Sequence, residues 1–203
     1  MTHSEDIRGE NYKGFNTANE MGLFSFLRDN KDIDINIKTI LKMYAILSNE
    51  ETASFRKENI HIKTSNDKFY VPTSGANVEK EMNLLCERFN YLNHPNADDF
   101  DDIFKFILQF ICIHPFHNGN GRLSAFLISL LLMKFGLTNA LYLPIDALMN
   151  GLYIERTTQE IRKASGFFYK MKEYDYDSYI SYMKELIMKS YKLLLKSSES
   201  IKK

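Results

Sequence analysis

The sequence predicts a mostly α-helical protein, built around one domain with a short β-hairpin. Hydrophobic residues make up 44% of the 203 positions, which is enough for a sizeable core. Glycine and proline are scarce, at 9 and 4 residues, so little interrupts the helices. Apolar side chains recur at helical spacing through most of the chain, and one segment has the pattern of two short strands.

Helical spacing of apolar residues predicts the main elements. Segments 100–113 and 123–135 are the most apolar, so we expect two buried central helices joined by a glycine-rich loop. Acidic residues at 98–102 suit the positive end of the first of these helices. Residues 1–31 are polar except for an apolar cluster at 21–27, and no element is assigned there. Further amphipathic helices are predicted over 36–48, 78–92, 150–164 and 176–196.

The hairpin is predicted between residues 55 and 72. Apolar residues on both sides, among them Ile60, Ile62 and Phe69, flank the turn-like sequence at 64–67. Pro72 ends the second arm, because proline cannot donate a ladder hydrogen bond.

Composition excludes several classes of protein. The formal net charge is zero, which gives no case for bulk nucleic-acid binding. Cys86 and Cys112 lie in apolar helical runs without a CxxC pair, so we expect reduced thiols. The apolar run 123–133 is about half the length of a membrane span, and the polar N-terminus lacks a signal-peptide pattern. We therefore expect a cytoplasmic protein, although export into another cell stays open.

The nine residues His114–Arg122 are the clearest candidate for a functional site. Gly119, Asn120 and Gly121 come at or near the start of a predicted helix, where unpaired N–H groups and the helix dipole form an anion site. Arg122 adds a planar charge suited to phosphate. Together they indicate a site for a di- or triphosphate.

His114 is the candidate base at this site. It is expected at the end of the preceding helix, and an imidazole that titrates near neutral pH can accept a proton from a hydroxyl. Phe116 is expected to enter the core and pin the loop. His114 and His117 have HxxH spacing, but no third His or Cys ligand stands nearby, which disfavours a zinc site.

The motif resembles the signature of the Fic (filamentation induced by cAMP) family, His-x-Phe-x-(Asp/Glu)-Gly-Asn-Gly-Arg-x-x-Arg. Residues 54–62 and 69–72 also resemble the Fic flap, a β-hairpin that docks the target protein by strand addition. The resemblance covers roughly residues 36–165 and implies a helical Fic-type bundle. It further implies transfer of AMP from ATP to a Ser, Thr or Tyr hydroxyl of a protein, the chain itself included.

The resemblance also implies residue roles. His114 would be the base, the turn at 119–121 would cradle the α- and β-phosphates, and Arg122 would clamp phosphate oxygens. The position that holds Mg²⁺ (or Mn²⁺) in the family is Asn118 here. The expected nucleotide-binding residues are Phe116, Gly119, Asn120, Gly121, Arg122 and Arg8.

Three departures from the family pattern affect these expectations. Asn118 replaces the acidic metal ligand, so weaker metal binding is expected. Ala125 replaces the second arginine, which in the family holds the γ-phosphate and pairs with an inhibitory glutamate. Arg8 stands where that glutamate would be in the nearest N-terminal match, with Glu10–Asn11 as a weaker alternative register. The usual autoinhibitory pair is therefore not expected, and Arg8 is either a substitute γ-phosphate ligand or a solvated charge.

These expectations divide the chain into three parts. They are an N-terminal arm with a degenerate inhibitory region (1–35), a Fic core with the flap (36–165), and a C-terminal amphipathic helix with a basic tail (166–203). Transfer of UMP or phosphocholine, a catalytically weak nucleotide-binding or toxin-regulating module, and a homodimer are left open. A Doc-like kinase would carry lysine at Gly121, so phosphoryl transfer is disfavoured, and AMP removal is disfavoured because it relies on the inhibitory glutamate.

Overall fold

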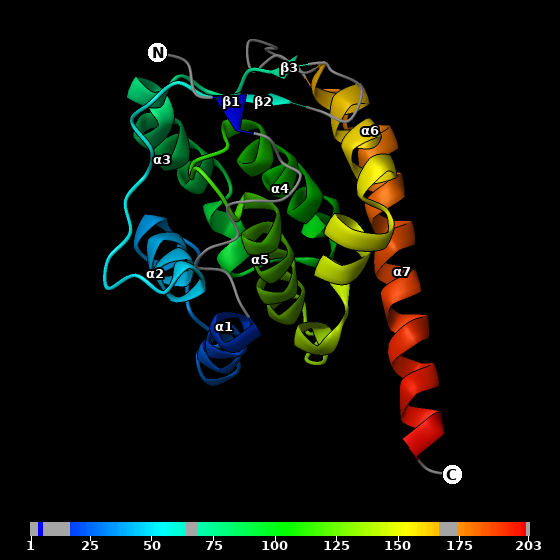
Figure 1. Cartoon of the computed structure of the whole chain (residues 1–203). Coiled ribbons are helices and arrows are strands. Elements are labelled where there is room, and N and C mark those ends of the chain that lie inside the picture. Colours follow the sequence, from blue (N-terminus) through cyan, green and yellow to red (C-terminus); the bar gives the residue numbers. More distant parts are fainter. Residues whose placement is uncertain (1–3, 6–16, 64–68, 167–173, 202–203) are drawn as a thin grey trace.

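The computed structural model describes residues 4–5, 17–63, 69–166 and 174–201. Two helices at its centre carry the fold, α4 (Asp102–Ile113) and α5 (Asn120–Lys134), and they pack against each other (Figure 1). Nine of the twelve residues of α4 are buried. The prediction of two buried helices joined by the glycine-rich loop is confirmed.

The remaining helices cover this central pair on two sides (Figure 1). On one side lie α1 (Thr17–Asp29), α2 (Ile37–Ser48) and α3 (Val78–Arg88). On the other lie α6 (Ile154–Ser165) and α7 (Tyr176–Ile201), which pack on each other, and the C-terminal part of α7 extends beyond the body. The fold is mostly α-helical, as predicted.

Several element boundaries differ from the sequence prediction. Helix α1 was not predicted, because its apolar residues are confined to one short cluster at 21–27; of its residues, Leu23 and Leu27 are buried. Helix α3 ends at Arg88 and a 3-10 turn continues it, and α6 is preceded by a π-helical turn at Ala147–Leu152. The other short 3-10 turns are Gly75–Asn77, Ala97–Asp101 and Ala140–Tyr142.

A small three-stranded sheet lies across one end of the bundle (Figure 1). Its strands β2 (His61–Lys63) and β3 (Phe69–Tyr70) pair antiparallel, which confirms the hairpin, while its turn lies outside the described residues. The strand β1 (Ser4–Glu5) was not predicted and pairs parallel with β2. The first arm is shorter than predicted because the N–H of Arg56 bonds to the carbonyl of Pro115 instead of to a strand.

Two further sequence expectations bear on compartment. Cys86 and Cys112 are free cysteines, as expected, with Cys112 buried. Within the described residues, none of the helices combines the length and the apolar character that a membrane crossing requires.

Candidate active site

The motif loop connects the two central helices in a fixed turn. Helix α4 ends at Ile113, and His114 follows it in the left-handed region, with φ 52° and ψ 64°. Gly119, with φ 76°, is the residue before α5, so the first N–H groups of that helix lie at the turn, as the sequence predicted. Such N–H groups lack intrahelical partners and attract anions.

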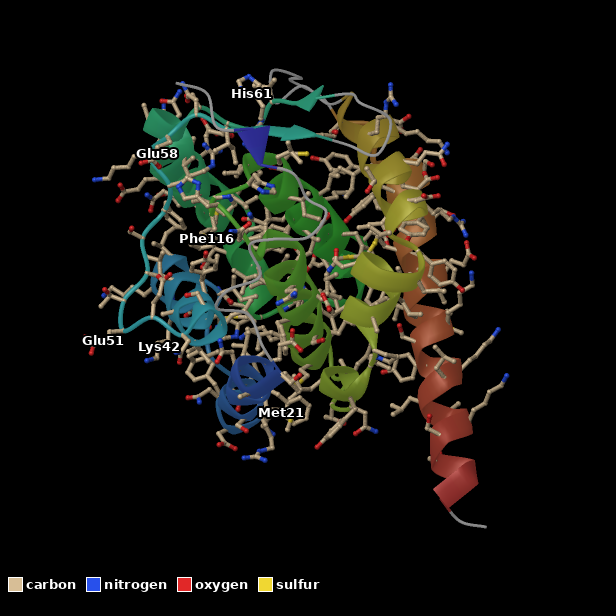
Figure 2. All side chains as sticks on the ribbon, viewed as in Figure 1. Met21, Lys42, Glu51, Glu58, His61 and Phe116 are labelled. Atoms are coloured by element: carbon tan, nitrogen blue, oxygen red, sulfur yellow. The ribbon has the colours of Figure 1, made fainter. Side chains whose placement is uncertain are left out.

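Phe116 pins the loop from inside, as predicted. Its side chain is only 1% exposed and lies within the helical body (Figure 2). It stacks on Tyr44 of α2, with 3.7 Å between the ring centroids. Because the ring is buried in the core, any contact of Phe116 with a nucleotide would have to come from its backbone.

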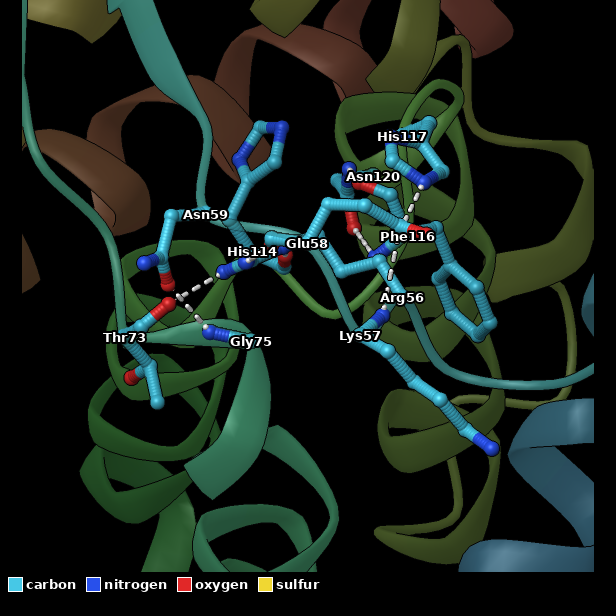
Figure 3. Close-up of polar contacts among 10 residues, drawn as sticks. All are labelled: Arg56, Lys57, Glu58, Asn59, Thr73, Gly75, His114, Phe116, His117 and Asn120. Carbon is cyan, nitrogen blue, oxygen red and sulfur yellow. Dashed lines mark hydrogen bonds and ion pairs between the residues drawn. The ribbon is translucent and has the colours of Figure 1, made fainter. Parts of the chain in front are cut away.

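Asn120 has a bracing role that the sequence did not reveal. Its side chain is buried and bonds both polar groups of the Phe116 backbone (Figure 3). The N–H of Phe116 donates to Oδ1 at 3.1 Å, and Nδ2 donates to the carbonyl of Phe116 at 2.8 Å. The side chain of Asn120 is therefore committed to the loop, while its backbone N–H belongs to the first turn of α5.

His114 sits in surroundings that keep it uncharged. The residue is partly exposed, but its Nδ1 is buried. Burial lowers the pKa of His114 to about 3, and the positive charges of Arg56 and His117 act in the same direction. The sequence-based expectation of titration near neutral pH is thus wrong for the protein without ligand, because burial penalises the imidazolium. A neutral imidazole is the form that can accept a proton.

Arg122 is partly buried and faces a carboxylate from the N-terminal part of the chain. Its Nη1 lies 3.6 Å from Oε1 of Glu20 on α1. No sequence pattern indicated this pair. Ala125, at the position of the family's second arginine, is buried on α5 with 3% exposure.

At the position predicted to hold a metal, the chain offers a single neutral ligand. Asn118 is exposed in the loop. Among the described residues, no cluster of three or more His, Cys, Asp or Glu is placed to hold a metal ion. An amide oxygen can ligate Mg²⁺, which commonly takes few protein ligands when phosphates supply others. The site therefore fits a metal carried mainly by a triphosphate. Arg8 lies outside the described residues.

Gly121 lies close to a side chain from another element, a contact that sequence reasoning missed. A Cβ at this position would lie 2.7 Å from Oδ1 of Asn150, whose Nδ2 donates to Asp146 at 2.8 Å. Asn150 belongs to the π-helical turn, and such turns are frequent at functional sites. Only the packing of this turn on α5 brings the two residues together.

Comparison with known proteins agrees with this geometry. Residues 34–132 match the model of the Fic/DOC family. A Fic family protein from Desulfovibrio desulfuricans shares the fold at a TM-score of 0.66 and 18% identity over 89% of this chain and 52% of its own. A Fic domain containing signaling protein from Bacteroides thetaiotaomicron shares the fold at a TM-score of 0.66 and 15% identity. This match covers 90% of this chain and 71% of that protein. The chain thus spans about half the length of the first of these proteins. No curated protein matches its sequence.

Proposed function

We propose that this chain, whose residues 34–132 match the model of the Fic/DOC family, is a protein adenylyltransferase. It would transfer AMP from ATP to a Ser, Thr or Tyr hydroxyl of a protein, itself included. One observation carries the proposal. A neutral imidazole at the end of α4 lies across a braced loop from the anion-binding start of α5.

The mechanism follows from these positions. His114 accepts the proton of the target hydroxyl, whose oxygen attacks the α-phosphorus, and the bond to the departing pyrophosphate breaks. The N–H groups at the start of α5 hold phosphate oxygens, and Arg122 neutralises charge on them. Mg²⁺, ligated by Asn118 and the phosphates, would offset further negative charge. Positioning and electrostatics supply most of the acceleration in such a site.

The flap would dock the target by strand addition, with one restriction set by the sheet. The strand order is β1-β2-β3, so β1 covers one side of β2. An incoming strand can therefore extend the described sheet at β1 or at β3, or take the place of β1. Of the two outer strands, only β3 belongs to the hairpin of the flap, so we propose that edge for the target.

Other transferred groups stay alternatives, and one observation bears on them. Residue 121 is a glycine, where a Doc-like kinase would carry lysine. This disfavours direct phosphoryl transfer. UMP or phosphocholine transfer and a catalytically weak nucleotide-binding module are distinguished by experiment.

The test is intact-mass measurement of the protein, and of lysate proteins, after incubation with each nucleoside triphosphate or CDP-choline and Mg²⁺ or Mn²⁺. We expect an added AMP with ATP that disappears in His114→Ala. His94→Ala is the control, since His94 is exposed and lies outside the motif loop, and it should keep activity. Measurable ATP binding without any adduct would identify a binding module instead.

The metal role of Asn118 is tested separately. Asn118→Asp adds a charged oxygen ligand, so we expect faster transfer at low Mg²⁺ and a smaller difference at high Mg²⁺. The measurement is a Mg²⁺ titration of the initial transfer rate in both proteins. An unchanged titration curve would show that residue 118 does not hold the metal.

A further inference from the structure

A buried arginine joins the flap to the motif loop. Arg56 is 3% exposed and lies in the segment before β2, 58 residues from His114 in sequence. Its guanidinium donates to four backbone carbonyls (Figure 3 shows the surrounding residues). The acceptors are His114 at 2.7 Å, Ile113 at 3.1 Å, Glu58 at 2.6 Å and Thr73 at 2.6 Å.

Two of these carbonyls terminate α4. The last carbonyls of a helix lack intrahelical donors and carry the negative end of its dipole, so a cation stabilises them. The other two carbonyls, those of Glu58 and Thr73, lie on the two sides of the flap. A guanidinium is planar and presents five donors in a fixed fork, so it holds these groups in one geometry, which a lysine could not reproduce.

The backbone near Arg56 adds further links between the same two regions. The N–H of Arg56 donates to the carbonyl of Pro115 at 3.0 Å. On the outside, Nε2 of His117 lies 3.0 Å from Oε2 of Glu58. Arg56 is the buried member of this set and contacts the peptide of His114 directly.

The bond from Arg56 to the His114 carbonyl involves a residue with an unfavourable backbone conformation. His114 has a positive φ, which costs a non-glycine residue free energy unless its surroundings fix it. The Nε bond to the His114 carbonyl fixes the peptide that follows the residue, and with it the direction of the side chain.

We propose that Arg56 is a positioning residue that holds His114 at a fixed place relative to the flap. The inference rests on the proposed function, in which the flap presents the target hydroxyl and His114 accepts its proton. Both groups then meet in one geometry because one guanidinium holds the flap and the base. A misplacement of about 1 Å can cost on the order of a hundredfold in rate.

The first test measures this link without any activity. Hydrogen–deuterium exchange is compared in the wild type, Arg56→Lys and Arg56→Met, with Arg88→Met as control. Arg88 also donates to an oxygen on α4, that of Gln109 at 2.8 Å, but lies away from the flap. We expect Arg56→Met to speed exchange in both residues 57–63 and residues 113–118, while α7 is unchanged. The exchange rates of Arg56→Lys should lie between those of the wild type and Arg56→Met. Unchanged exchange in either segment would overturn the proposal.

The second test separates positioning from loss of structure. ATP affinity is measured by calorimetry and the transfer rate by intact mass. Because the phosphate turn is braced by Asn120 and not by Arg56, we expect ATP affinity in Arg56→Met within about twofold of wild type and a transfer rate lower by on the order of a hundredfold. Equal losses of ATP affinity and transfer rate in Arg56→Met would contradict a positioning role. So would a loss of transfer rate no greater than that in Arg88→Met. If the wild type transfers nothing, the proposed function fails, and the exchange result alone decides whether Arg56 joins the two regions.

Discussion

The side-chain amide of Asn120 bonds both the N–H and the carbonyl of Phe116, closing the motif loop on itself. Both partners are buried, so removal of the amide would leave two backbone groups without hydrogen bonds. We expect Asn120→Ala to lower the free energy of unfolding by about 2–6 kcal/mol, because each of the two buried unsatisfied groups costs about 1–3 kcal/mol. Urea denaturation measures this change.

Asn83→Ala is the matched control for this substitution. Asn83 also donates to a carbonyl four residues earlier, that of Glu79, but it is exposed on α3. Its removal should change stability by no more than about 0.5 kcal/mol. Similar losses in both variants would show that burial of the Asn120 bonds is not what matters.

Gly75, at the base of the flap, is expected to tolerate no side chain. A Cβ there would lie 2.0 Å from the carbonyl oxygen of Lys57, which is backbone and cannot rotate away. Gly75→Ala should therefore lower the melting temperature markedly, whereas Gly151→Ala, with no atom within 4 Å of its Cβ, should not. Calorimetric scans of both variants provide the comparison. An unchanged melting temperature in Gly75→Ala would show that the flap base shifts easily.

The pKa of His114 predicts how stability depends on pH. The folded value is about 3 and the ordinary value 6.5, so between these values the unfolded chain binds a proton that the folded chain does not. Stability should therefore fall as the pH drops from 6.5 towards 3. In His114→Asn the free energy of unfolding should fall less steeply over this pH range, as measured by urea denaturation at several pH values. Parallel curves for the two proteins would mean that His114 titrates normally in the fold.

The contact between Glu20 and Arg122 should weaken ATP binding. Removing the carboxylate frees Arg122 for phosphate, and a partly exposed pair at 3.6 Å is worth at most about 1 kcal/mol. We expect Glu20→Gln to tighten ATP binding by up to about fivefold, since 1.4 kcal/mol is about tenfold. Asp29→Asn removes the same charge from an exposed pair with Arg28 on α1 and should leave the affinity unchanged. Calorimetric titration with ATP measures both affinities. Equal ATP affinities in the two variants would contradict a weakening effect of Glu20.

The sequence by itself determined the central helices and the chemistry of the loop between them. In α4 and α5 the apolar residues are so dense that burial follows from composition alone, and the loop residues are neighbours in sequence. Helix α1 escaped prediction because its apolar residues are confined to one short cluster at 21–27 in an otherwise polar segment. The predicted domain boundaries, metal, partners and nucleotide contacts stay predictions.

Tertiary structure alone decided which distant groups surround that loop. Arg56 reaches His114 from 58 residues away, Glu20 reaches Arg122 from α1, and Asn150 lies against Gly121. Periodicity reports which face of an element is apolar, but not which polar side chain of another element will come to lie beside it. Those contacts depend on how the elements pack, and here they decide which groups surround His114 and the turn at Gly119 to Gly121.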